Sequence, residues 1–209
     1  MSEVVLNDSQ VYRILKRAFD IVASAVGLVV FSPLCLMTCL AVKIDDPGPA
    51  VFSQPRNGLD DAVFDMYKFR SMHCGAAQER PAMGSLNELD GPAFKMKDDP
   101  RITRVGRVIR KTSIDELPQL VNVLKGEMSM VGPRPLATYE TAKLAPEYRK
   151  RTMVKPGLVC FWQVRGRSTI PFQEWMEMDF EYIEKAGLLT DAKILLEAIP
   201  AVITCKGAQ

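Results

Sequence analysis

Hydrophobic residues are concentrated in one long run near the amino terminus. From Ala18 to Val42 the chain reads AFDIVASAVGLVVFSPLCLMTCLAV, 25 residues in which Asp20 is the only ionisable side chain. A helix that spans a bilayer needs about 20 such residues, so length alone allows one span. Pro33 interrupts the run, because proline lacks a backbone donor and clashes with the carbonyl four residues before it. The pieces 18–31 and 33–43 would be about 21 Å and 16 Å long, each shorter than the ~30 Å hydrocarbon core.

The charges before this run favour a re-entrant helix over a span. Three basic residues precede it, Arg13, Lys16 and Arg17, and they assign its start to the cytoplasmic side under the positive-inside rule. A straight span would export residues 44–209 with unpaired cysteines, which is unusual in an oxidising compartment. We therefore expect a hairpin broken at Ser32-Pro33, in which serine satisfies freed backbone groups. A spanning helix with a mild kink remains the alternative.

Periodicity and turn signals predict the elements that follow. Residues 45–49, DDPGP, end the run, and Asn57-Gly58 is a strong hairpin signal. We expect a two-stranded element, Ala50–Gln54 with Val63–Arg70, and a loop or small insertion over 75–97. Apolar spacing at i, i+3, i+4 and i+7 predicts helices over 101–111, 117–124, 171–185 and 188–203. The predicted fold class is α+β, mainly helical.

Composition narrows the class of protein without identifying it. The chain has 209 residues, 47% of them hydrophobic and 25% charged, and a net charge of +2. These values are typical of a folded domain, and the net charge gives no reason to expect a nucleic-acid binder. The five cysteines form an odd set without CxxC spacing, which argues against a disulfide framework and a zinc site. No GxGxxG, P-loop or Asp-x-Asp motif occurs.

Two adjacent carboxylates are the main candidates for chemistry. Asp115 and Glu116 precede Pro118, at the amino end of the helix expected over 117–124. Helix capping is one explanation, since acidic residues are favoured there and Ser113, three before Glu116, matches a capping box. The surroundings favour another, because five cations without an acid lie just upstream: Arg101, Arg104, Arg107, Arg110 and Lys111. Carboxylates beside cations stay ionised, and a helix amino terminus binds phosphate. A solvated basic face or an RNA-binding stripe would also explain the cations.

Further candidates lie on either side of this pair. Lys68 and Arg70 project to the same face of a strand and could bind one anion. Arg134 stands between two prolines, which favour an extended backbone. Residues 148–173 hold six cations and no acid, and they include the aromatic pair Phe161-Trp162. This composition suits nucleic acid or an anionic membrane surface. The aromatic residues of the helix expected over 171–185 suit either core packing or seating at a membrane interface.

Taken together, these segments closely resemble the small bacterial sugar transferases, which are monotopic polyprenyl-phosphate phosphoglycosyl transferases. The resemblance covers roughly residues 13–185. It rests on six motifs in order: KRAFD (16–20), the Ser32-Pro33 break, KFRSM (68–72), DDPRITRVGRVIRKTSIDELPQL (98–120), MVGPRP (130–135), and KPG with the nearby Trp162, Gln163, Val164, Gly166 and Arg167. Each motif is weak alone, but six in order are highly specific.

The resemblance implies a fold and a reaction. It implies a re-entrant membrane helix in an N-terminal segment, residues 1–44, and a membrane-associated catalytic domain, residues 45–209, with interfacial amphipathic helices. The implied location is the cytoplasmic face of the inner membrane. The implied reaction moves a phosphosugar from a UDP-sugar to polyprenyl phosphate, the first membrane step of glycoconjugate assembly, with magnesium (Mg2+) as cofactor.

The resemblance also assigns roles to particular residues. Asp115 would be the nucleophile and the magnesium ligand, and Glu116 its partner. Three cations would bind phosphate: Lys68, Arg110 and Arg134. Where the family commonly has KPGLTGW, this chain has KPGLVCFW, which leaves the role of Val159-Cys160-Phe161 open.

Two rival functions are also compatible with parts of the sequence. A membrane-anchored interaction protein, in which the acidic pair only caps a helix, would have no transfer activity. A membrane-tethered RNA binder would bind RNA in a salt-sensitive way without Asp115. Neither accounts for all six motifs, so the expected partners are a UDP-sugar, polyprenyl phosphate and membrane lipid, and no nucleic acid. A homodimer is left open.

Overall fold

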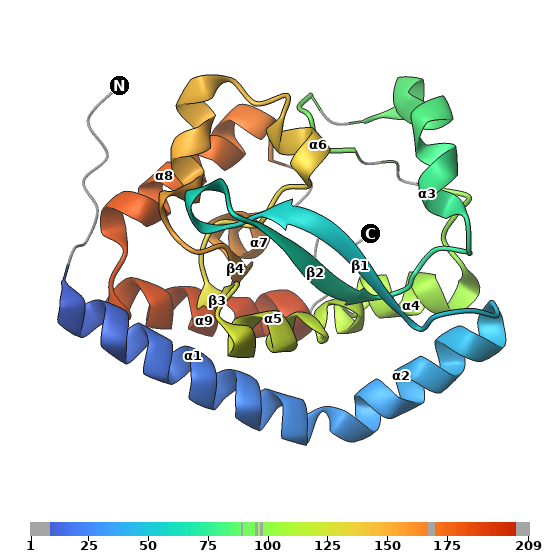
Figure 1. Cartoon of the computed structure of the whole chain (residues 1–209), viewed down its shortest axis with the longest axis horizontal. Coiled ribbons are helices and arrows are strands. Elements are labelled where there is room, and N and C mark those ends of the chain that lie inside the picture. Colours follow the sequence, from blue (N-terminus) through green and yellow to red (C-terminus); the bar gives the residue numbers. More distant parts are fainter. Residues whose placement is uncertain (1–8, 89, 95, 97, 167–169, 204–209) are drawn as a thin grey trace.

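The computed structural model describes residues 9–203, apart from 89, 95, 97 and 167–169. Arg167 and Cys205 therefore lie outside the described residues. Within the described part, helices surround two small two-stranded sheets (Figure 1). This arrangement confirms the prediction of a mainly helical α+β chain with a small antiparallel hairpin.

The hydrophobic run forms two helices that meet at a sharp bend. Helix α1, Gln10–Val30, and helix α2, Ser32–Asp45, are separated only by Phe31. Their axes are bent by 60°, and the pair runs along one edge of the molecule (Figure 1). The Ser32 hydroxyl donates to the Val29 carbonyl at 2.7 Å. This confirms the predicted break at Ser32-Pro33. No single helix of the described chain is long and apolar enough to cross a membrane, but α1 and α2 qualify together as a bent pair.

The predicted hairpin is present, with a longer first strand and a different turn. Strand β1, Val51–Asn57, pairs antiparallel with β2, Val63–Phe69. The connection contains a short 3-10 turn, Leu59–Asp61 (η1), in which Asp60 and Asp61 have positive φ. The two strands are therefore not joined by a two-residue turn at Asn57-Gly58.

The middle of the chain is more helical than predicted. Residues 75–97, expected to be a loop, contain helix α3, Ala76–Glu79, and a 3-10 segment, Arg80–Leu86 (η2). The next elements are α4, Arg104–Lys111; the 3-10 turn η3, Ile114–Glu116; and α5, Gln119–Lys125. Gly126 ends α5 in the left-handed region at φ 88°, a conformation that glycine adopts without the steric cost of a Cβ.

The carboxyl-terminal part builds the largest core. Strand β3, Ser129–Val131, pairs in parallel with β4, Gly157–Val159. Five helical elements accompany them: α6, Thr138–Thr141; the 3-10 segment η4, Pro146–Met153; α7, Phe161–Arg165; α8, Phe172–Lys185; and α9, Leu188–Ile203. Trp175 and Tyr182 of α8 are 5% and 3% exposed within this core. Core packing therefore explains these two aromatic residues, and the alternative hypothesis that they lie at a membrane interface was wrong.

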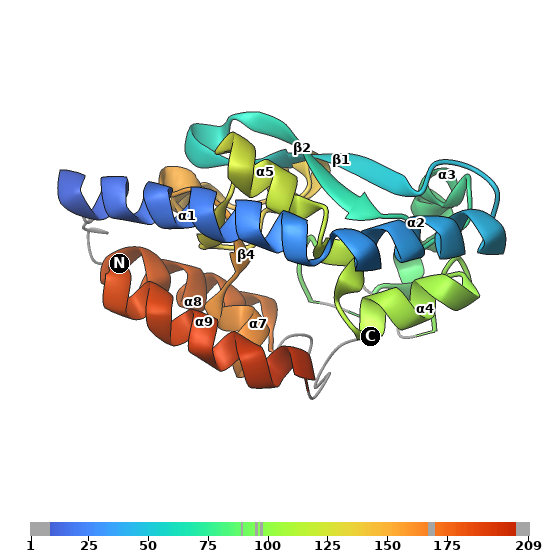
Figure 2. The ribbon, with the colours of Figure 1, turned by 90° about the horizontal axis from the view of Figure 1, so that it is seen from below.

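Helix α1 is tied to the rest of the chain by polar contacts. Buried Asp20 accepts hydrogen bonds from the Ser129 hydroxyl and the Met130 backbone N–H, at 3.0 and 2.9 Å. Lys16 donates to the Val131 carbonyl at 3.0 Å and pairs with Asp191 of α9 at 2.7 Å. In agreement, α9 lies alongside α1 in Figure 2. Helix α1 therefore helps to position β3, which leads directly into the loop that carries Arg134.

Candidate active site

The two carboxylates occupy a tight turn between α4 and α5. Ser113 has φ 58°, in the left-handed region, and η3 follows it at once. No hydrogen bond from the Ser113 side chain caps this turn, so the predicted capping box does not form. Asp115 is 7% exposed, and an acidic cap would normally be solvated. Ordinary capping therefore does not account for the acidic pair.

Two cations from distant parts of the chain converge on this pair. Lys68 of β2 lies 3.0 Å from Glu116 Oε1 and 3.8 Å from Asp115 Oδ2. Arg134, in the loop after β3, donates from Nη2 to the same Glu116 Oε1 at 2.5 Å. The structure therefore brings together four of the five predicted site residues through direct contacts. The fifth, Arg110 on α4, acts on Asp115 through its charge, and no ion pair joins the two in the described part of the chain.

Burial and the neighbouring charges shift the pKa values of the two carboxyl groups in opposite directions. Burial raises the pKa of Asp115, while the positive charge of Lys68 partly opposes the rise. Burial also disfavours ionised Glu116, but Arg134 and Lys68 outweigh it and lower the pKa of Glu116. Neighbouring groups whose pKa values are driven apart are typical of paired catalytic carboxylates. Arg134 and Lys68 therefore hold Glu116 in its ionised form, whereas burial disfavours the charged form of Asp115.

Several predicted cations have structural partners instead. Arg70 does not join Lys68, because β2 ends at Phe69 and the Arg70 guanidinium turns toward Asp46 at the end of α2. Arg101 is 3% exposed and pairs with Asp99 at 2.6 Å. These two arginines stabilise the fold, and the prediction that Lys68 and Arg70 bind one anion was wrong.

Sequence reasoning missed a buried ion pair that supports Arg134. Arg151 of η4 pairs with Asp179 of α8 at 2.6 Å, with side chains 4% and 2% exposed. Arg151 Nη2 also donates to the Arg134 carbonyl at 2.7 Å. The signal was Asp179 itself, the single carboxylate on the apolar face of α8 that includes Trp175 and Tyr182. In the sequence, Arg151 is one of six cations in the basic stretch 148–173, and nothing near it in the chain indicates a buried partner.

Asn122, also missed, joins the strand that carries Lys68 to α5. Its fully buried side chain accepts from the Tyr67 backbone N–H at 3.0 Å and donates to the Asp65 carbonyl at 2.7 Å. These bonds hold β2 against α5, whose amino end follows the acidic pair. The relative position of Lys68 and Glu116 therefore depends on this amide.

The pattern of the bacterial sugar transferase family matches residues 11–205 of the chain. The chain belongs to this family. The UDP-glucose:undecaprenyl-phosphate glucose-1-phosphate transferase of Caulobacter vibrioides is 44% identical to it over 204 residues, which cover 92% of this chain and 71% of the relative.

Two other relatives of this chain are longer than it. The galactosyl transferase CpsE of Streptococcus agalactiae and the undecaprenyl-phosphate galactose phosphotransferase of Salmonella typhimurium are each 41% identical. The matches cover 94% of this chain but only 44% and 42% of these proteins. The chain thus spans less than half the length of these two relatives.

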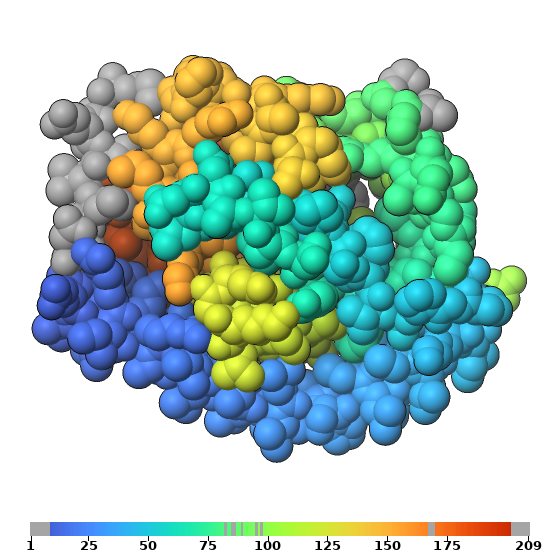
Figure 3. Space-filling model, in the orientation of Figure 1, coloured from blue at the N-terminus to red at the C-terminus, as the bar shows by residue number. Residues whose placement is uncertain are grey.

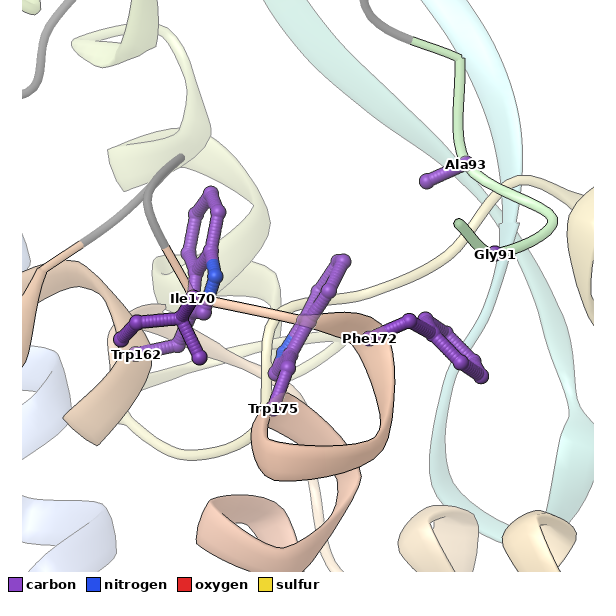
Figure 4. A pocket seen from close by; sticks show the side chains of 6 residues that line it. All are labelled: Gly91, Ala93, Trp162, Ile170, Phe172 and Trp175. Atoms are coloured by element: carbon purple, nitrogen blue, oxygen red, sulfur yellow. The ribbon is translucent and has the colours of Figure 1, made fainter. Parts of the chain in front are cut away.

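The segment in which this chain departs from the common motif of the family lies beside the acidic pair. Val159 ends β4, and Cys160 and Phe161 are buried at the start of α7. From α7, Gln163 Nε2 donates to Glu116 Oε2 at 3.4 Å. Figure 4 shows a small apolar pocket at the same helix, where Trp162 and Trp175 stack with ring centroids 4.7 Å apart.

The site offers few ligands for a metal ion. No group of three or more His, Cys, Asp or Glu side chains that could hold a metal occurs in the described residues. Both oxygens of Glu116 already accept hydrogen bonds, from Lys68, Arg134 and Gln163, whereas the nearest cation to Asp115 is 3.8 Å away. Mg2+ is usually bound by one or two carboxylates together with substrate phosphates and water. Asp115 fits that role.

Proposed function

We propose that this chain transfers a sugar phosphate from a UDP-sugar to a membrane polyprenyl phosphate, giving polyprenyl-diphosphate-sugar and UMP. The observation that carries the proposal is the contact of Lys68 and Arg134 with Asp115-Glu116 in a member of the bacterial sugar transferase family. The names of two relatives describe transfer of glucose-1-phosphate or galactose phosphate to undecaprenyl phosphate, which supports the same class of reaction here.

The cations are suited to a diphosphate substrate. Lys68 and Arg134 both contact Glu116 Oε1, so two positive charges lie side by side where one diphosphate could bind both. Burial lowers the pKa of Lys68, and Glu116 partly opposes that change. Phosphoryl transfer depends mainly on positioning and on compensation of charge, and buried cations perform both tasks.

Asp115 is the proposed nucleophile. In the first step a carboxylate oxygen of Asp115 bonds to the β-phosphorus of the UDP-sugar, the bond to the bridging oxygen breaks, and UMP leaves with the electron pair. In the second step an oxygen of polyprenyl phosphate attacks the same phosphorus and Asp115 leaves as a carboxylate. Two steps let one small site handle both substrates in turn. Asp115 is only 7% exposed, so little hydration must be removed before its carboxylate attacks.

Asp115 is also the residue that would hold Mg2+ beside the diphosphate. When bound, this ion would offset negative charge on the phosphate oxygens and the leaving UMP. Lys68, Arg134 and Arg110 would share that task. Glu116, which stays ionised, would keep the two closest cations oriented.

The structure also supports re-entry of α1 and α2 into the membrane from one side. Apolar side chains along the pair are strongly exposed, as shown by Val29 at 74% and Leu36 at 64%, and Figure 3 shows the two helices as one band along an edge. Both ends of the pair bind the same folded domain. Tyr12 donates to Asp191 at 3.0 Å, and the Cys74 N–H donates to Asp46, just after α2, at 2.9 Å. A helix pair tied at both ends to one domain would enter and leave on the same face, the cytoplasmic face of the inner membrane.

Release of UMP tests the proposed reaction. Detergent-solubilised protein is incubated with a panel of UDP-sugars, polyprenyl phosphate and magnesium. We expect Asp115→Asn to abolish UMP release with little loss of melting temperature, because asparagine keeps the shape of the side chain and removes only the nucleophilic charge. Glu116→Gln should also impair release strongly. Asp65→Asn, on the exposed face of β2, is the matched control and should leave UMP release unchanged.

The outcomes separate the proposal from its rivals. Near-normal turnover of Asp115→Asn would overturn the covalent mechanism. No UMP release by the parent protein with any UDP-sugar would favour an interaction protein without catalysis. Salt-sensitive RNA binding that survives Asp115→Asn would favour the RNA-binding alternative.

Labelling of single cysteines tests the membrane topology. Gln10→Cys and Lys193→Cys, both exposed, are placed one at a time in a chain without native cysteines and treated with a membrane-impermeant thiol reagent in sealed cells. We expect neither site to react. With Ser32→Ala and Pro33→Leu, a continuous apolar helix could span, and position 193 should become reactive. Labelling at 193 in the chain with Ser32-Pro33 intact would overturn re-entry.

A further inference from the structure

We propose that Gln163 is a positioning residue for the transfer reaction, and that its amide holds Glu116 in place while the cations bind phosphate. The inference rests on the proposed function. Gln163 lies outside the acidic pair and its cations. It belongs to α7, which begins at Phe161, in the segment where this chain departs from the common motif.

The orientation of the Gln163 amide is set by its neighbour Cys160. Cys160 is the residue before α7 and has an extended backbone, φ −145° and ψ 167°. Its N–H donates to Gln163 Oε1 at 3.0 Å, and its thiol lies 3.4 Å from the same oxygen. Because the carbonyl end of the amide is occupied, the NH2 end must face the other way. It meets Glu116 Oε2 at 3.4 Å.

The two oxygens of Glu116 have different kinds of partner. Oε1 accepts from Lys68 and Arg134, both charged, whereas Oε2 accepts from the neutral amide of Gln163. A diphosphate substrate competes for the cations through its charge. It has much less attraction for an amide without net charge. Gln163 therefore remains on Glu116 when Lys68 and Arg134 turn toward phosphate, and Glu116 keeps the geometry from which it orients them.

Helix α7 is rigid enough to support this role. Phe161 packs edge-on against Tyr182 with ring centroids 6.3 Å apart. Trp162 stacks on Trp175 at 4.7 Å, as Figure 4 shows. Both contacts fix α7 on α8, so Gln163 projects from a fixed backbone. Cys160 contributes mainly through its backbone N–H, which any residue except proline supplies, and this explains how the departure from the common motif can be tolerated.

Steady-state kinetics of the full chain in detergent tests the inference. Gln163→Glu keeps an oxygen for the Cys160 N–H but presents a second carboxylate to Glu116, and Gln163→Met removes both bonds at similar length. We expect each to lower kcat at least about tenfold, the scale of one hydrogen bond to a charged group. The KM for the UDP-sugar should change by less than about threefold, since loss of a transition-state interaction lowers kcat rather than binding.

A variant on the exposed surface is the control for these substitutions. Gln173→Glu places a carboxylate against Glu177, its partner at 3.2 Å on the exposed surface of α8, and should leave kcat unchanged. A kcat within about twofold of the parent for both Gln163 variants, or an effect confined to KM, would overturn the inference. If the parent releases no UMP, the proposed function fails and this inference fails with it.

Discussion

Removal of the negative charge of Asp179 should strongly destabilise the protein. Asp179→Asn leaves Arg151 buried without a charged partner, since the two side chains are 2% and 4% exposed. Breaking a buried ion pair by removing one partner costs about 3–5 kcal/mol. The asparagine oxygen can still accept one bond from Arg151, and the Arg134 carbonyl accepts another at 2.7 Å, so the lower value of about 3 kcal/mol is expected.

A surface pair on the same helix provides the control. Glu181 lies two residues beyond Asp179 and pairs with Arg165 and Lys185, with 29% of its side chain exposed. Solvent screens such exposed pairs, so Glu181→Gln should lower the free energy of unfolding by less than about 1 kcal/mol. The difference between the two single variants isolates the effect of burial.

A double replacement tests the cause. Burial raises the pKa of Asp179 even though Arg151 opposes the rise, so the lost hydration outweighs the attraction between the two charges. Arg151→Met with Asp179→Leu removes both charges together. Such replacements are often neutral or stabilising, so the double variant should be more stable than Asp179→Asn.

Urea unfolding in detergent measures these free energies. Fluorescence of the stacked Trp162 and Trp175 reports unfolding of the core that contains the pair, and the midpoint and slope give the free energy of unfolding. The reasoning is refuted if Asp179→Asn and Glu181→Gln shift the midpoint equally. It is also refuted if the double variant is as unstable as Asp179→Asn.

Two further predictions concern close packing and thiol exposure. Gly106→Ala would place a Cβ 1.9 Å from the Ser71 carbonyl oxygen, and this overpacking against the backbone should destabilise the protein by about 3 kcal/mol. The control is Gly84→Ala, whose Cβ would meet no atom within 4 Å. Equal melting temperatures of the two variants would contradict the prediction. Burial raises the pKa of the Cys160 thiol to about 12, so this thiol should react slowly at pH 8. Mass spectrometry after brief alkylation at that pH should find exposed Cys74 modified and Cys160 unmodified. Rapid modification of Cys160 in the folded protein would contradict its buried position.

Some features of this protein could be predicted from the sequence because their causes are local. Proline lacks a backbone donor wherever it occurs, so the break at Ser32-Pro33 needed no knowledge of the fold. The spacing of apolar residues also predicted the helices over 171–185 and 188–203 nearly to the residue. The order of motifs led to the family, which the comparison with known proteins confirmed.

The geometry of the candidate site depended on contacts between residues far apart in the chain. Lys68 and Arg70 are equivalent by strand periodicity, yet the end of β2 at Phe69 separates them, and only Lys68 reaches Glu116. Likewise, a capping box at Ser113 was compatible with the sequence, but the left-handed backbone at that residue prevents it.

The roles of Arg151 and Gln163 could not be predicted from the sequence for the same reason. Arg151 looked like one more surface cation until α8 brought Asp179 against it. The sequence indicates no role for Gln163, which contacts Glu116 only because the fold places α7 beside the acidic pair. Local sequence determined where helices begin, bend and end, because backbone donors and apolar periodicity are properties of neighbouring residues. Only the tertiary structure decided which charges meet, because the cost of burying a charge is offset by partners that the folded chain brings from elsewhere.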